Sequence, residues 1–283
     1  MDYRLIQSDS NPKFKRWRKL AENARFIKKE KATLAEGAHL LLTMAERGIT
    51  PTALLLRSGG ISDEVGNVVE NYAREGVPCY VLDNRLYDMI SPVEHGAGIM
   101  AEVAIIERAL PVAQKTDVLY LDGVQDPGNV GTLIRSAVAA GIKTIAANRE
   151  TAALWSPKAL RAGMGAHFAA AIYENVEPCE LADAFDAKRL AADARGGSDL
   201  YATADWEKGN VVWMMGAEGP GLSEEALACA DKRLYIPIEH DCESLNVGAA
   251  AAVCLFELRR RRLSLKSLKW CGLNRALNSC ESF

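Results

Sequence analysis

Apolar and polar residues alternate along most of the chain in short runs that match two kinds of element. Short apolar runs predict buried strands, and longer stretches with apolar residues three and four positions apart predict amphipathic helices. Before residue 107 the pattern predicts strands at 32–35, 53–57, 79–82 and 99–106, with helices at 37–47 and 62–74. This alternation is typical of one small α/β domain.

The pattern lapses between residues 108 and 116, around Pro111, and we interpret this stretch as a linker. The alternation resumes at residue 117, and a last helix is expected from about 246 into the arginine run 259–262. Further strands are predicted at 118–121, 143–147, 189–192, 211–216 and 234–238. Repeated β-α units predict a mostly parallel sheet, buried on both faces, with its ligand site beyond the carboxyl ends of the strands.

The organisation that follows is an α/β fold in two parts. Residues 1–107 form the small α/β domain, 108–116 the linker and 117–262 the second, parallel α/β domain. Residues 263–283 show no sustained periodicity, and we expect a short extra helix or a loose tail there.

Composition narrows the class of protein. The chain has 283 residues, of which 49% are hydrophobic and 25% charged, and this excludes disorder, collagen and coiled coil. No apolar run approaches the ~20 residues of a membrane span, and no secretory signal is visible, so the predicted location is the cytoplasm. The seven cysteines include no C-x-x-C pair, so neither a disulfide framework nor a zinc knuckle is indicated.

Charge is unevenly distributed around a net value of −3. Residues 11–31 carry nine lysines and arginines against two glutamates, and the chain from Arg259 onward is also basic, so the body between them is acidic. The first basic stretch is either a solvated helix face or an arm that contacts phosphates, and the interleaved Phe14 and Trp17 favour the arm. The candidate RNA contacts are Lys15, Arg16, Arg18 and Lys19.

Three loops follow predicted strands and carry candidate chemistry. The first leads from the strand at 118–121 into a turn at 126–128, where Asn129 is well suited to cap the next helix. Arg135 follows nearly two turns later, and the small residues Gly128 and Gly131 would let a ligand approach the backbone.

The second loop, Gly216-Ala217-Glu218-Gly219-Pro220-Gly221, is neither a dinucleotide fingerprint nor a phosphate-binding P-loop. A plain tight turn would not need the carboxylate of Glu218 at its centre. The third loop starts at Ile236-Pro237-Ile238 and ends at Ser244-Leu245-Asn246, where Ser244 or Asn246 could cap the last helix.

In this order and spacing the three loops resemble the SpoU, or TrmH-like, family of S-adenosylmethionine-dependent RNA ribose 2′-O-methyltransferases. They match its N-x-G-x-x-x-R, G-x-E-G-x-G and I-P-x…S-L-N-V motifs, and residues 155–166 look like the family's linking segment. The amino-terminal part is similar to a ribosomal-protein-like substrate-binding domain, on Asn11-Pro12, Lys15 and Glu36-Gly37. Gly163 and Gly248 depart from the family pattern, which often has a hydroxyl residue at these places.

The resemblance implies a carboxyl-terminal trefoil knot in the parallel sheet, a homodimer, and S-adenosylmethionine as the cofactor. Backbone groups of Gly216, Ile236 and Leu245 would hold its adenine and ribose, with Gly219 and Glu218 shaping the pocket. The implied catalytic residues are Arg135, Asn129, Glu218, Ser244 and Asn246. A guanidinium is almost never neutral, so we expect Arg135 to stabilise a developing alkoxide rather than to accept its proton.

Two readings of other classes stay open beside this one. A Rossmann-type nucleotide enzyme lacks support because no acidic residue follows a G-x-G-x-x-G turn at the usual offset. A catalytically idle RNA-binding protein would not need the five candidate catalytic residues together. No His, Cys or carboxylate cluster at ligand spacing indicates a metal, and an amino-terminal domain of this kind favours ribosomal over transfer RNA as the substrate.

Overall fold

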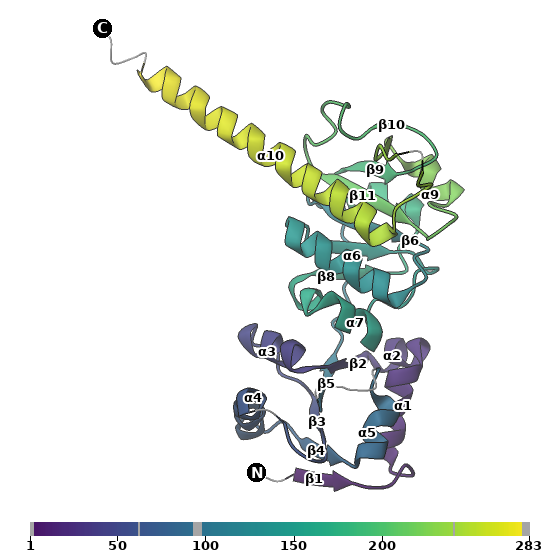
Figure 1. The fold of residues 1–283 in the computed structure, drawn as a ribbon, viewed down its shortest axis with the longest axis vertical. Coiled ribbons are helices and arrows are strands. Elements are labelled where there is room, and N and C mark those ends of the chain that lie inside the picture. The colour runs from purple at the N-terminus through teal and green to yellow at the C-terminus, as the bar shows by residue number, and fades with distance from the viewer. Residues whose placement is uncertain (1–2, 62, 93–97, 240, 279–283) are drawn as a thin grey trace. The chain divides into compact units, whose positions relative to one another are not determined.

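The computed structural model describes residues 3–61, 63–92, 98–239 and 241–278. The chain divides into two compact units, which we describe separately (Figure 1). The first unit comprises residues 1–109, 125–135 and 151–174, and the second comprises 110–124, 136–150 and 175–283. Two segments beyond residue 117 therefore belong to the first compact unit, and the domain boundaries at 107 and 117 stay predictions.

The first unit contains a mixed five-stranded sheet with the order β1-β4-β3-β5-β2. Strands β1, β4 and β3 are parallel, whereas β5 is antiparallel to both β3 and β2. The pattern at 32–107 predicted four of these strands and missed β1. The strands are β1 (Tyr3–Ile6), β2 (Ala32–Glu36), β3 (Ala53–Arg57), β4 (Cys79–Leu82) and β5 (Ile99–Ala104).

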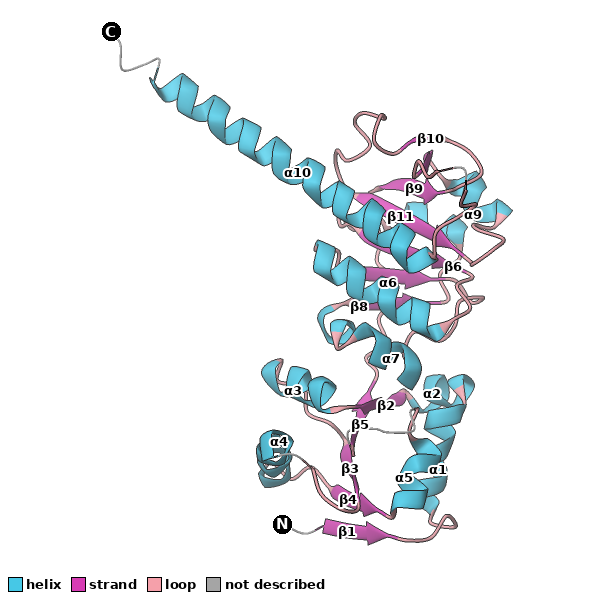
Figure 2. Cartoon of the chain, viewed as in Figure 1, coloured by secondary structure: helices cyan, strands magenta, loops and turns pink. Residues whose placement is uncertain are grey.

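Helices lie on both sides of this sheet (Figure 2), and their buried side chains form two hydrophobic clusters with it. Helices α1, α2 and α5 contribute to one cluster, and α3 and α4 to the other. The first-unit helices are α1 (Pro12–Glu22), α2 (Ala24–Glu30), α3 (Ala38–Glu46), α4 (Asp63–Arg74), α5 (Asn84–Ile90), α7 (Pro157–Gly163) and the 3-10 turn η1 (Ala166–Ala169). Each amphipathic helix thus places its apolar stripe on the sheet.

The second sheet has seven strands in the order β10-β12-β9-β11-β6-β7-β8, and the pairings from β10 to β7 are all parallel. This confirms the predicted parallel α/β architecture. Its strands are β6 (Val118–Asp122), β7 (Thr144–Ala147), β8 (Ala171–Glu174), β9 (Lys188–Ala192), β10 (Ser198–Asp199), β11 (Val211–Gly216) and β12 (Lys232–Tyr235). The associated helices are α6 (Pro127–Ala140), η2 (Pro178–Glu180), α8 (Leu181–Ala184), α9 (Glu224–Cys229) and α10 (Val247–Asn278).

Two expectations for this part of the chain are wrong. The strand predicted at 234–238 lies at 232–235, because Pro237 has no N–H to donate to a neighbouring strand. The last helix does not end at the arginine run but continues to Asn278, through a stretch that is rich in leucine and contains no proline. The trefoil knot stays a prediction. None of the helices in the described part of the chain combines the length and apolar character needed to cross a bilayer.

Candidate functional site

The loop after β11 is a closed turn at the carboxyl end of the parallel sheet. Ala217 and Gly221 exchange two backbone hydrogen bonds of 3.0 Å each, and Gly219 has a positive φ of 90°. A Cβ on Gly216 would lie 2.2 Å from the carbonyl carbon of Gly221, so the fold-back requires glycine there. Gly216, Gly219 and the exposed Glu218 thus share one tight loop.

The third loop presents apolar side chains to solvent. Ile238 is 36% and Leu245 is 39% exposed, while Ile236 is half-buried. Asn246 caps α10, because its Oδ1 accepts the N–H groups of Gly248 at 2.9 Å and Ala249 at 3.3 Å. This loop therefore leaves apolar surface exposed beside polar groups.

Ser244, the other cap candidate of this loop, is exposed and does not occupy the N-cap position of α10. Its carbonyl oxygen accepts a hydrogen bond from the Cys242 thiol at 3.1 Å. Asn246 therefore has the structural role for which both residues were candidates.

In the first unit, α6 begins with a cap that differs from the expected one. Asp126 caps the helix, since its Oδ1 accepts the backbone N–H of Asn129 at 2.9 Å. Its Oδ2 pairs with Lys158 Nζ at 2.8 Å, and this lysine lowers the pKa of Asp126. Asn129 is not the cap but lies in the first turn of the helix, with its side chain half-buried.

Gly131 of this helix serves packing, which corrects the expectation that it admits a ligand. A Cβ on Gly131 would lie 2.3 Å from the carbonyl oxygen of Ala159 and 2.7 Å from the amide nitrogen of Gly163, both on α7. A Cβ on Gly128 would lie 2.6 Å from Oδ1 of the capping Asp126. Gly131 therefore lets α6 approach the backbone of α7 closely.

Arg135 is exposed on the same helix, six residues after Asn129. Among the described residues, none makes a hydrogen bond or ion pair with its side chain. The guanidinium is accordingly available for a phosphate or a ribose oxygen.

The segment before and after α7 is attached to the sheet of the first unit. The carbonyl oxygen of Trp155 accepts a 2.6 Å hydrogen bond from the buried Thr33 hydroxyl of β2. His167 is 1% exposed and its Nε2 lies 2.9 Å from the carbonyl oxygen of Leu154. Its ring explains the glycine at 163, because a Cβ there would lie 2.5 Å from His167 Cε1.

The amino-terminal basic stretch forms α1 and α2. Phe14 and Trp17 are 0% and 2% exposed and belong to the core, so these two aromatic residues do not support an RNA-contacting arm as expected. Arg16 pairs with Glu30 at 2.9 Å and with Glu102 at 2.7 Å.

The other three candidates for RNA contact, Lys15, Arg18 and Lys19, are exposed. Arg18 also pairs with Glu22 at 3.0 Å within the helix. The exposed cations lie on the outer face of α1, whose opposite face is packed on the sheet.

Two arginines of the run in α10, Arg261 and Arg262, bind groups within the second unit, whereas Arg259 and Arg260 are exposed. Arg261 donates to the carbonyl oxygens of Leu200, Tyr201 and Thr203, and Arg262 pairs with Asp117. Together they fix α10 to the loop between β10 and β11.

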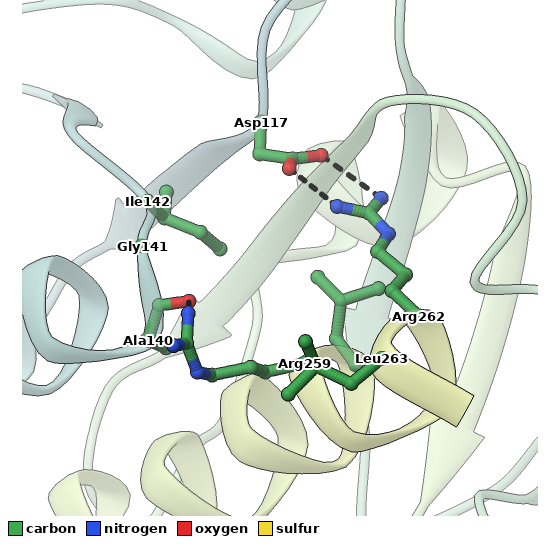
Figure 3. Close-up of a pocket in the computed structure, with 8 residues that line it drawn as sticks. Asp117, Ala140, Gly141, Ile142, Arg259, Arg262 and Leu263 are labelled. Atoms are coloured by element: carbon green, nitrogen blue, oxygen red, sulfur yellow. Dashed lines mark hydrogen bonds and ion pairs between the residues drawn. The ribbon is translucent and has the colours of Figure 1, made fainter. Parts of the chain in front are cut away.

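A pocket of about 200 Å³ lies beside this cluster (Figure 3). It is lined by Asp117, Ala140, Gly141, Ile142, Leu258, Arg259, Arg262 and Leu263. Its cations are already engaged, since Arg262 pairs with Asp117 and Arg259 donates to the carbonyl oxygen of Ala140. It opens at the amino ends of β6 and β7, whereas ligands of parallel sheets bind at the carboxyl ends.

Comparisons with known proteins agree with this arrangement. Residues 117–256 match the SpoU rRNA Methylase family, and residues 11–101 match the MRM3-like substrate binding domain. The chain is 31% identical to the 23S rRNA (guanosine(2553)-2'-O)-methyltransferase RlmP of Bacillus subtilis. The aligned region covers 90% of this chain and 98% of that protein. It is 28% identical to the 23S rRNA (guanosine-2'-O-)-methyltransferase RlmB of Xanthomonas campestris, and the aligned region covers 74% of this chain and 88% of that protein.

The same likeness holds among solved structures. The AdoMet-bound rRNA methyltransferase from Sinorhizobium meliloti superposes with a TM-score of 0.78 at 27% identity, over 92% of this chain and 98% of that one. Both the expected cofactor and the two-part organisation are thereby supported. The chain belongs to the SpoU rRNA methylase family and is an S-adenosylmethionine-dependent RNA methyltransferase with an amino-terminal substrate-binding domain.

Proposed function

We propose that the enzyme methylates the 2′-hydroxyl of a ribose in ribosomal RNA. The observation that carries the proposal is the similarity over 90% of the chain to a methyltransferase named for 2'-O methylation of 23S rRNA. The exposed Arg135 and the half-buried Asn129, held on one helix, support a catalytic rather than an idle protein.

The loops at the carboxyl end of the second sheet are the proposed cofactor pocket. Backbone groups of Gly216, Ile236 and Leu245 hold the adenine and ribose, and Gly219 and Glu218 shape the same pocket. The exposed side chain of Leu245 supplies apolar surface that a bound nucleoside removes from water. When bound, S-adenosylmethionine supplies an electrophilic methyl group whose leaving group is a neutral thioether.

The catalytic task of the chain is to align and activate a ribose hydroxyl, which is a poor nucleophile until its proton leaves. Arg135 stabilises the charge that develops on the oxygen, while a phosphate or water takes the proton. Asn129 and Asn246 orient the ribose or hold the loops in shape, and Ser244 contributes one hydrogen bond.

The outer face of α1 is the proposed RNA contact of the first unit. Lys15, Arg18 and Lys19 carry this surface, because their side chains reach solvent. Arg16 contributes less, since Glu30 and Glu102 already hold its guanidinium. Contacts of this kind position RNA through its phosphates and carry no sequence information.

A homodimer that works without a metal ion completes the proposal. Phe256 and Leu263 of α10 are 45% and 53% exposed, as expected of a surface that a second copy covers. Within the described part of the chain, no group of three or more His, Cys, Asp or Glu side chains could hold a metal ion. The predicted location remains the cytoplasm.

The test is methyl transfer from labelled S-adenosylmethionine to purified RNA. Ribosomal RNA from cells that lack the enzyme should gain one label, recovered as a 2′-O-methylnucleoside after nuclease digestion. Arg135→Ala should lower the rate by about 100- to 1,000-fold, as loss of a donor to a developing oxyanion does. The exposed Arg74, whose partners among the described residues are Glu70 and Asn71 of its own helix, offers the matched control Arg74→Ala.

The outcomes separate the alternatives. Label in transfer RNA instead of ribosomal RNA would show that the enzyme performs the same reaction on transfer RNA. Absence of label, with RNA still bound, would identify an idle RNA-binding protein. Arg135→Lys should retain a small rate if the charge matters, whereas a Lys variant faster than wild type near neutral pH would make this residue a general base.

A further inference from the structure

The loop of residues 216–223, which follows β11 in the second unit and which we call the cofactor loop, is attached to the strands on both sides of β11. The sheet order places β11 between β9 and β6, and Gly216 at the end of β11 is in register with Asp122 at the end of β6. One side chain from each neighbouring strand or its loop holds the backbone that follows Gly216.

Asp122 holds the far end of the loop. Its side chain is buried, with 2% of the residue exposed, and its Oδ2 accepts the backbone N–H of Ser223 at 2.6 Å. Its Oδ1 accepts from Nδ2 of Asn148, the residue after β7, at 2.6 Å. Asn148 Oδ1 in turn accepts the N–H of Gly123 at 3.0 Å. The Asp122 carboxylate is therefore held in place independently of its hydrogen bond to Ser223.

Arg195 holds the tip from the opposite side. It lies in the loop after β9, and its guanidinium donates to the carbonyl oxygens of Gly219 at 2.6 Å and Pro220 at 2.9 Å. The planar fork of an arginine can bridge two adjacent carbonyl groups in this way.

The loop that carries Arg195 is itself anchored. Asp193 Oδ1 accepts the backbone N–H of Arg195 at 3.0 Å, and Asp193 Oδ2 accepts from Arg233 Nε of β12 at 2.8 Å. The Asp193 N–H also donates to the carbonyl oxygen of Leu234 at 2.9 Å. Sequence patterns could not single out Arg195, because its partners lie 24 and 25 residues away and belong to the backbone.

We propose that Asp122 and Arg195 are positioning residues that preset the Gly216–Ser223 loop in its cofactor-binding shape. The inference rests on the proposed role of Gly216 and Gly219 in that pocket. A loop that is already ordered loses less conformational freedom when the cofactor binds, so its anchors raise affinity without touching the ligand.

Arg195 is the cleaner residue to test, because its guanidinium lies at the surface and its removal leaves the core intact. Arg195→Ala should weaken S-adenosylmethionine binding about 10-fold, which corresponds to 1.4 kcal/mol, near the lower end for hydrogen bonds to a charged group. The S-adenosylmethionine affinity of Arg195→Lys should lie between those of wild type and Arg195→Ala, because an ammonium cannot bridge both carbonyls in one plane. RNA affinity and kcat at saturating cofactor should stay within 2-fold of wild type.

The matched control is Arg189→Ala. Arg189 lies at the other end of β9 and makes a bidentate pair with Asp231. It should leave cofactor affinity unchanged. Hydrogen exchange without cofactor should show faster exchange of the amides at 217–223 in Arg195→Ala and not in Arg189→Ala.

Asp122→Asn supplies a second line of evidence. Its amide keeps one acceptor for Ser223 but turns a donor toward Asn148 Nδ2, so the affinity should fall by at least as much as in Arg195→Ala. Thermal unfolding of this variant shows whether the loss reflects misfolding.

A Leu245→Asp variant separates this inference from the proposed pocket. If Leu245→Asp binds the cofactor normally, the proposed location of the cofactor pocket is refuted, and with it the positioning role of Asp122 and Arg195. If Leu245→Asp loses the cofactor while Arg195→Ala matches Arg189→Ala in affinity and in exchange, the pocket stands and the positioning role is refuted.

Discussion

Replacing Gly131 by alanine should destabilise the enzyme, although alanine is the better helix former. The new Cβ would lie 2.3 Å from the Ala159 carbonyl oxygen, 2.6 Å from the Ala162 Cβ and 2.7 Å from the Gly163 nitrogen. Two of these three atoms belong to the backbone of α7, so the conflict cannot be relieved by a side-chain rotation. The helices must separate by about 1 Å to restore ordinary contacts.

The size of the effect follows from two opposing contributions. Overpacking against backbone should cost about 3 kcal/mol, the upper part of the usual range, while glycine-to-alanine in a helix gains about 1 kcal/mol. Gly131→Ala should therefore lower the free energy of unfolding by about 2 kcal/mol. Gly66 of α4 is the matched control, because a Cβ there would meet nothing within 4 Å. Gly66→Ala should therefore stabilise by about 1 kcal/mol.

Urea and thermal unfolding of both variants measure this difference of about 3 kcal/mol, or roughly 6–12 °C in Tm. Methyl transfer supplies a second readout, since Asn129 and Arg135 lie on either side of Gly131 on the displaced helix. A 1 Å shift of catalytic groups can cost about 100-fold, so kcat should fall in Gly131→Ala and not in Gly66→Ala. A Gly131→Ala protein that unfolds at or above the wild-type temperature would refute the packing argument.

Three further predictions concern charge. Burial lowers the pKa of His167 to about 4 from 6.5, so its stabilising effect is complete above pH 6.5 and is lost as pH falls through 4. The loss is about 3 kcal/mol, so the urea midpoints at pH 7 and pH 4.5 should differ less for His167→Gln than for wild type; equal acid sensitivity of the two proteins would contradict this. Arg262→Ala should cost about 2 kcal/mol, because two loop carbonyls lose a donor and Asp117 loses its guanidinium partner while it still accepts the N–H of Val211. The exposed Arg260 pairs with Glu257, and Arg260→Ala should cost clearly less; equal losses in denaturant titrations would argue against the anchoring role. Combined alanine substitution of Lys15, Arg18 and Lys19 should reduce the log–log salt slope of RNA binding by about 2–3 with cofactor affinity unchanged, and an unaltered slope would make α1 a solvated face.

The alternation of strands and helices, and the three loops that carry the family's motifs, could be predicted from the amino-acid sequence. Both depend on local information. Strand β11 and the helix after Asn246 are set by apolar periodicity and by a cap within a few residues, and the motifs are contiguous in the chain. Their order alone was enough to indicate the reaction and the cofactor.

The roles of individual side chains became clear from the three-dimensional fold. Gly131 faces α7 rather than a ligand, and Trp17 lies in the core although lysines and arginines surround it in sequence. Arg262 pairs with Asp117, 145 residues away, and Arg195 donates to the carbonyl oxygens of Gly219 and Pro220. Burial and the identity of a charge's partner depend on residues distant in the chain, and a pattern of neighbours does not contain that information.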